Sequence, residues 1–253
     1  MPSKAKQKSY LFTHWHNMRH HFSQFLNARE MNDLHQMRIH IKKIHALVIF
    51  IAYLNESQEV KRSFKPVKTL FRKAGKIREL QIHFEKLKKE NKDKSLLAKK
   101  LNKQIEAETI RFLKKKKKWI DIVQNTYPNI DSKITNCPEG KLIVYLKTSI
   151  SEVFKYFNKE NFHEARKIIK VILNLHTLLS KFSAGSLKLN LSYLDEMQNK
   201  IGNWNDLEQR IKRLKKSQRS KSEIMEFKIL TKELIRSKKE LKKSVYLNTV
   251  SVQ

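Results

Sequence analysis

A regular apolar stripe lies in the first third of the chain. Its members are spaced alternately by three and four residues, so they share one side of an α-helix. They are Leu34, Met37, Ile41, Ile44, Val48 and Ile51. A shorter stripe recurs at Phe162, Ala165, Ile169 and Ile172. A stripe of this kind is normally buried against other helices, so both segments are predicted to be packed helices.

The rest of the composition also favours helices. Glycine and proline occur only four times each in 253 residues, which is typical of long helices joined by few turns. The helical pattern breaks near Asn55, at 125–140 and around 183–186. We therefore predict an all-α protein with a boundary in the middle break. Two halves of about four helices each are expected, with a short tail after them, at 1–126, 139–246 and 247–253.

A row of basic residues follows each apolar stripe by one position. One residue corresponds to a rotation of about 100°, so each row lies on the flank of its helix. The first row is His35, Arg38, Lys42 and His45, and the second is His163, Arg166 and Lys170. Basic residues beside a buried stripe also help to keep a helical bundle in solution. Two rows with the same phase and order nevertheless favour a common function.

The net charge predicts an anionic partner. The chain has 55 Lys and Arg against 24 Asp and Glu, giving a net charge of +31, and such a charge opposes compaction unless an anion balances it.

The single cysteine, Cys137, can form no internal disulfide. The longest apolar run, at 46–54, is far shorter than the ~20 residues of a membrane span. We expect a cytoplasmic protein that does not cross a membrane.

Two of the four glycines occupy matching positions in helical sequence. Gly75 lies forty residues after His35, and Gly202 lies thirty-nine residues after His163. A glycine inside a helix costs about 1 kcal/mol relative to alanine. Its recurrence therefore predicts the close approach of a neighbouring helix, or a local bend, at both positions.

Taken in order, four motifs resemble those of the conserved histidine α-helical domain, called the CHAD domain. They are HQMRIHIKK at 35–43, GKIREL at 75–80, HEARKIIK at 163–170 and IGNWNDL at 201–207. The resemblance covers nearly the whole chain. It implies two four-helix bundles related by an approximate internal two-fold repeat, with a basic channel between them. It also implies binding of inorganic polyphosphate and association with polyphosphate granules.

The basic rows and the resemblance together predict a set of polyphosphate-binding residues. They are His35, Arg38, Lys42, Lys43, His45, Arg72, Lys76, Arg78, His163, Arg166, Lys167 and Lys170. The second half departs from the family pattern: Leu173 and Asn174 replace a usual arginine and tyrosine, and Asn205 replaces the arginine of the first glycine motif. We therefore expect the second half to bind more weakly.

Other candidate sites are less specific. His16 and His20 have the i, i+4 spacing of a metal-binding pair, but no nearby carboxylate or cysteine completes a site, so no metal is expected. In the lysine run 114–118, the outermost members are expected to face solvent. Lys114, Lys117 and Lys118 can share one side of a helix and widen the basic surface.

No pattern in the sequence indicates catalysis or a cofactor. The chain contains no glycine-rich phosphate loop, nucleophile elbow or pair of carboxylates placed for metal-assisted hydrolysis. A non-catalytic polyphosphate-binding protein is the first hypothesis. A nucleic-acid-binding protein is the second, although no aromatic residues are interleaved with the basic rows to stack on bases. A polyphosphate-metabolising enzyme is the third. The oligomeric state is left open.

Overall fold

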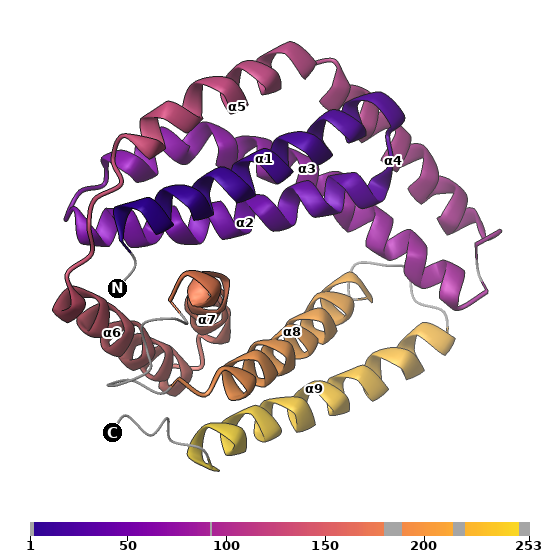
Figure 1. The fold of residues 1–253 in the computed structure, drawn as a ribbon. Helices are drawn as coiled ribbons and strands as arrows, with labels where there is room; N and C mark the ends of the chain where they lie inside the picture. The colour runs from indigo at the N-terminus through magenta and orange to yellow at the C-terminus, as the bar shows by residue number, and fades with distance from the viewer. Residues whose placement is uncertain (1–2, 92, 180–188, 215–220, 248–253) are drawn as a thin grey trace. The chain divides into compact units, whose positions relative to one another are not determined.

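The computed structural model describes residues 3–91, 93–179, 189–214 and 221–247 (Figure 1). Within these residues it contains nine α-helices and no β-strand, which confirms the all-α prediction. The helices are α1 (Lys4–Ala28), α2 (Met31–Leu54), α3 (Glu59–Lys89), α4 (Leu96–Leu113), α5 (Lys116–Asp131), α6 (Glu139–Asn158), α7 (Phe162–Leu179), α8 (Leu191–Leu214) and α9 (Lys221–Leu247).

The chain divides into two compact units between Cys137 and Pro138. Helices α1 to α5 belong to the first unit and α6 to α9 to the second. The first unit has five helices, where about four were expected, because the lysine run contains a turn that separates α4 from α5. Helix α5 also continues to Asp131, beyond the expected end at 126. The predicted break at 183–186 and most of the predicted tail lie outside the described residues.

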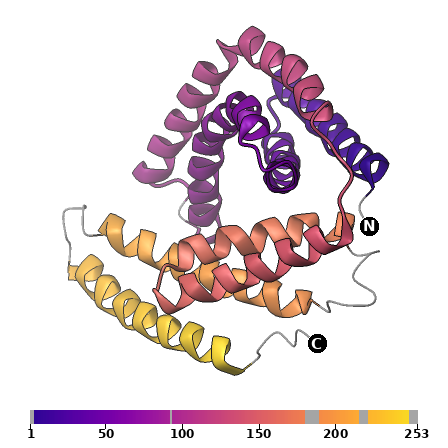
Figure 2. The same ribbon diagram turned by 90° about the vertical axis from the view of Figure 1, so that its left-hand side faces the viewer.

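Helix α2 is central to the first unit, where it packs against both α1 and α3 (Figure 2). All six residues of its apolar stripe are buried, as the spacing predicts. Helix α1 contributes large side chains to the same core, among them Trp15, Met18 and Phe25. Helix α3 packs in addition against α4 and α5, and α1 packs against α5. The basic flanks of α2 and α3 are thus held beside a rigid apolar core.

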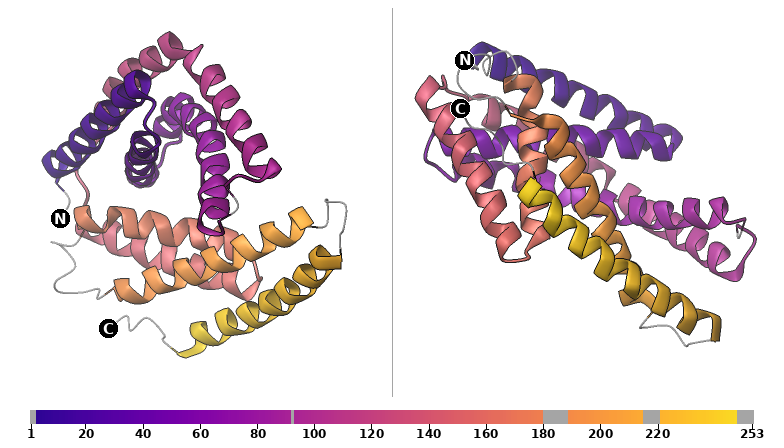
Figure 3. Two further views of the ribbon diagram at one scale, coloured as in Figure 1. Left: turned by 90° about the vertical axis from the view of Figure 1, so that its right-hand side faces the viewer. Right: turned by 90° about the horizontal axis from the view of Figure 1, so that it is seen from below.

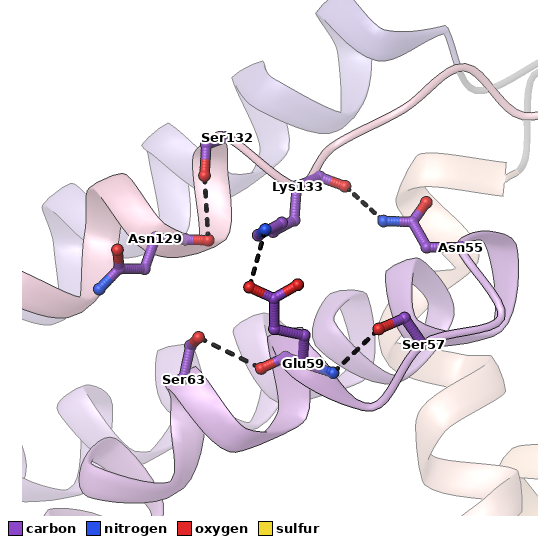
Figure 4. Close-up of polar contacts among 7 residues, drawn as sticks. All are labelled: Asn55, Ser57, Glu59, Ser63, Asn129, Ser132 and Lys133. Carbon is purple, nitrogen blue, oxygen red and sulfur yellow. Dashed lines mark hydrogen bonds and ion pairs between the residues drawn. The ribbon is translucent and has the colours of Figure 1, made fainter.

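Polar contacts join the segment after α5 to the end of α2 and the start of α3 (Figure 4). Asn55, which caps the C-terminus of α2, donates from Nδ2 to the backbone oxygen of Lys133 at 2.8 Å. Lys133 pairs with Glu59 at the start of α3, with 2.8 Å between Nζ and Oε1. Gln7 of α1 donates to the backbone oxygen of Thr135 at 2.8 Å. These contacts hold the segment that follows α5 against α1, the end of α2 and the start of α3.

In the second unit each helix packs against the next, α6 on α7, α7 on α8 and α8 on α9 (Figure 3). One apolar cluster joins all four helices and includes the whole second stripe, Phe162, Ala165, Ile169 and Ile172. Tyr193 and Ile201 of α8 belong to the same cluster. In the described part of the chain, no helix combines the length and the apolar character of a membrane span.

Candidate anion-binding site

In the first unit, Arg38 extends from α2 across α3 and lies on Gly75. Its Nη1 donates a hydrogen bond to the backbone oxygen of Phe71, four residues before Gly75. The guanidinium carbon lies 3.9 Å from the centre of the Phe71 ring, within the range of a cation–π contact. A Cβ added to Gly75 would lie 2.7 Å from Nη1, so the arginine could not keep its place beside any larger residue.

The second unit contains the same arrangement. Arg166 extends from α7 across α8, and its Nε donates to the backbone oxygen of Gln198 at 3.0 Å. Gln198 again precedes the glycine by four residues, and a Cβ on Gly202 would lie 2.7 Å from Nη2 of Arg166. The sequence led us to expect a close helix or a bend at each glycine. The close neighbour at both glycines is instead the arginine side chain.

Four residues of α2 and α3 form what we call the α2–α3 basic cluster: His35, Arg38, Lys42 and Arg78. The charges of the other three members all act on His35. Burial, and then the charges of Arg78, Lys42 and Arg38, lower the pKa of His35, while Glu85 opposes them. Both causes disfavour the imidazolium form of His35, so the positive charge of the cluster comes mainly from the arginines and the lysine.

Arg38 keeps its charge although it is half-buried. Burial, followed by repulsion from Arg78, lowers the pKa of Arg38 to about 10, which leaves it protonated at neutral pH. Lys42 is exposed to solvent. The cluster therefore combines an exposed ammonium group with two partly buried guanidinium groups.

Arg78 has hydrogen-bonding capacity left over. Its Nη1 lies 3.3 Å from Oε1 of Glu85, which also accepts a hydrogen bond from Gln81 at 2.9 Å. Nε of Arg78 is buried and has no hydrogen-bond partner. A buried donor without a partner is costly. The Arg78 side chain is 20% exposed, so an anion could pair with Nε only if the surroundings of this atom moved.

The second unit differs in charge at the matching place. Asn205 stands where the first unit has Arg78, and the next residue, Asp206, acts on Arg166. Burial lowers the pKa of Arg166, and the carboxylate of Asp206 opposes that shift. Lys167 already has an ion-pair partner, since both carboxylate oxygens of Glu164 lie 2.8 Å from its Nζ. The second unit thus supplies its own anions beside the arginine.

Two of the predicted binding residues of α2, Lys43 and His45, have neighbours outside the cluster. Lys43 acts on His14 and His40, so its charge belongs to the side of α2 that faces α1. The ring of His45 is stacked on Phe64 of α3, with 5.6 Å between ring centres. The structure therefore places neither of them among the residues of the α2–α3 basic cluster.

The remaining predicted residues are Arg72, Lys76, His163 and Lys170. Arg72 is exposed and donates to the hydroxyl of Thr69 at 3.2 Å. Lys76 and His163 are exposed, and Lys170 is half-buried. Lys76 follows Gly75 directly in α3, so its exposed side chain can extend the basic surface of the first unit.

A histidine cluster between α1 and α2 was not predicted. Nδ1 of His14 lies 3.2 Å from Nδ1 of His40, whose ring is stacked on His21, and Nδ1 of His21 lies 2.7 Å from Oδ1 of Asp33. Burial is the main cause that lowers the pKa of both His14 and His40 to about 4. The seven-residue spacings 14–21 and 33–40 are the signal that could have revealed this cluster.

Of the two histidines with metal-pair spacing, His20 lies against the ring of His21, with 5.3 Å between ring centres. His16 is exposed and its ring is stacked on Phe12, with 6.1 Å between ring centres. Across the described residues, no group of three or more histidine, cysteine or acidic side chains is arranged to hold a metal ion.

No family model, curated protein or solved structure matches this chain. The contacts of its own residues are therefore the basis for any statement about its function.

The arginine–glycine contact predicts a specific energetic coupling. Gly75→Ala should displace Arg38, so the gain of about 1 kcal/mol from replacing a helical glycine is cancelled by the lost hydrogen bond. In an Arg38→Ala background, the same Gly75→Ala change should stabilise the protein by about 1 kcal/mol. Chemical denaturation of the two single variants and the double variant measures this coupling.

Gly140→Ala is the matched control, because nothing lies within 4 Å of a Cβ added there. Its effect should be the same with Arg38 as without it. Additive effects of Gly75→Ala and Arg38→Ala would show that the arginine does not require the glycine.

Proposed function

We propose that this chain binds inorganic polyphosphate without catalysis, and that the α2–α3 basic cluster is its principal binding site. One observation carries the proposal. His35 is half-buried beside Arg38, Lys42 and Arg78, and the charges of all three lower its pKa, while Glu85 opposes them. Positive charge gathered in this way favours binding of an anion.

The chemistry of the cluster suits phosphate oxygens. Guanidinium groups pair with phosphate through two parallel hydrogen bonds, and a lysine ammonium adds a mobile point charge. Residues one helical turn apart are about 5–6 Å apart, so a flexible phosphate chain can meet successive cations by adjusting its torsions. Lys76, exposed beyond Gly75, would extend this path. Such binding requires no contact with a nucleic-acid base.

The resemblance to the CHAD domain supports the same proposal. It implies two bundles related by an internal repeat, and the matching contacts of Arg38 with Gly75 and of Arg166 with Gly202 support that relation. The basic channel stays a prediction from the resemblance. Association with polyphosphate granules in the cytoplasm belongs to the same proposal. Within it, the second unit contributes less, because Asp206 and Glu164 accompany its cations.

Binding to fluorescently labelled long-chain polyphosphate tests the proposed function. Affinity should fall steeply as salt rises, because each neutralised phosphate releases counterions. Arg78→Gln should weaken binding roughly tenfold. Arg111→Gln is the matched control, since Arg111 also pairs with a glutamate, at 2.7 Å, but is exposed on α4. The affinity of the Arg111→Gln variant for polyphosphate should be almost unchanged.

Three outcomes would contradict the proposal. Equal losses in the Arg78 and Arg111 variants would point to a general effect of net charge. Stronger competition by DNA or RNA than by polyphosphate at equal phosphate concentration would favour nucleic-acid binding. Release of orthophosphate in proportion to protein concentration would indicate an enzyme.

The charge difference between the units makes a separate prediction. Asp206→Asn should raise affinity for polyphosphate roughly fivefold, since it removes a negative charge that acts on Arg166, an effect of ~1 kcal/mol. Glu196→Gln, on the same helix, is the control: the Glu196 carboxylate pairs with Lys200 at 2.7 Å. If both variants gained equally in the labelled-polyphosphate titration, Asp206 would have no specific effect on the binding site.

A further inference from the structure

A groove of about 630 Å³ lies between α3 and α5 of the first unit. Its charged lining residues are Arg62 of α3 with Lys117, Lys118 and Asp121 of α5. Asn125 and Asn129 continue along the same side of α5. Ser63 and Asn129 lie where α3 begins and α5 ends, close to the Lys133–Glu59 pair (Figure 4). A groove of this size is typical of a site for a small molecule.

This α3–α5 groove is separate from the α2–α3 basic cluster. At about 100° per residue, Arg62 and Pro66 lie on roughly the opposite side of α3 from Gly75 and Arg78. The sequence left open whether the lysine run joins the polyphosphate-binding surface. All five of its lysines are exposed, and the structure places Lys117 and Lys118 in the groove instead.

The three cations of the groove have no ion-pair partner in the described part of the chain. Arg62 acts on Glu59, but that carboxylate is held by Lys133 at 2.8 Å. Neither Lys117 nor Lys118 lies within 4 Å of a carboxylate oxygen there. With Asp121, three cations and one carboxylate leave the groove with a net charge of +2. A phosphate monoester carries a charge of about −1.5 to −2 at pH 7 and complements it.

Asp121 and the side-chain amides indicate what else the ligand carries. A carboxylate and the oxygens of Asn125 and Asn129 accept hydrogen bonds, so they match a ligand that offers hydroxyl or amino groups. Pro66 and Ile122 supply apolar surface for its body. A bare polyphosphate chain has no such donors, and its negative charge would be repelled by Asp121.

We propose that the α3–α5 groove binds a small phosphate ester with hydroxyl or amino groups, such as a sugar phosphate or a nucleotide. Arg62, Lys117 and Lys118 bind the phosphate group, and Asp121 accepts a hydrogen bond from the organic part. This site is independent of polyphosphate binding by the α2–α3 basic cluster.

Calorimetric titration of the full chain with AMP, glucose 6-phosphate and inorganic phosphate tests the proposal. At least one of the two esters should bind more tightly than inorganic phosphate. Lys117→Gln with Lys118→Gln should weaken ester binding about tenfold or more, because two phosphate partners are lost. Lys114→Gln with Lys115→Gln is the matched control: it removes the same charge from the same run, outside the groove lining. Circular dichroism and the Tm check that both variants fold.

The Asp121→Asn variant separates ester binding from simple anion binding. It should weaken binding of the ester and leave inorganic phosphate unchanged or bound more tightly. The proposal is overturned if neither ester binds, if both lysine pairs give equal losses, or if Asp121→Asn strengthens the binding of esters and phosphate alike. Arg78→Gln should leave ester binding unchanged, so failure here is distinguishable from failure of the polyphosphate proposal.

Discussion

The contact between an arginine and a helical glycine organises the basic surface of each unit. Arg38 and Arg166 each reach a neighbouring helix and donate to a carbonyl four residues before a glycine. A guanidinium group at this depth needs an acceptor and space, and the glycine supplies the space. The glycine lowers the stability of its own helix, but it leaves the space that a charged, half-buried arginine needs. In the first unit, Arg78 lies close enough to that arginine to lower its pKa.

The same contact has different electrostatic surroundings in the two units. Arg78 stands near Arg38 and adds positive charge, whereas Asp206 stands near Arg166 and removes it. Like charges brought together at partial burial raise the energy of the first unit, and a bound anion would relieve that cost. In the second unit a carboxylate of the chain already has this role. The same arginine–glycine contact therefore occurs in two different electrostatic surroundings.

Local patterns predicted the helices and the core, while contacts between helices decided the site. The stripe from Leu34 to Ile51 is buried because three- and four-residue spacing is a property of one helix. The contact of Arg38 with Gly75 joins residues thirty-seven positions apart, and periodicity does not specify which residues of two helices meet. Lys43 and His45 show the same limit: Lys43 follows a member of the basic row and His45 belongs to it, but Lys43 acts on His14 of α1 and His45 is stacked on Phe64 of α3.

The pKa of His35 is the most direct measure of the central claim, that the α2–α3 basic cluster binds polyphosphate. In the free protein, burial and three cations lower this pKa. Phosphate charge nearby favours the imidazolium form, so NMR titration of the ring signals should show a higher pKa in the presence of polyphosphate. The complex would then take up a proton, and affinity would rise as pH falls through this range. A pKa of His35 that is unchanged or lower at saturating polyphosphate would contradict the account.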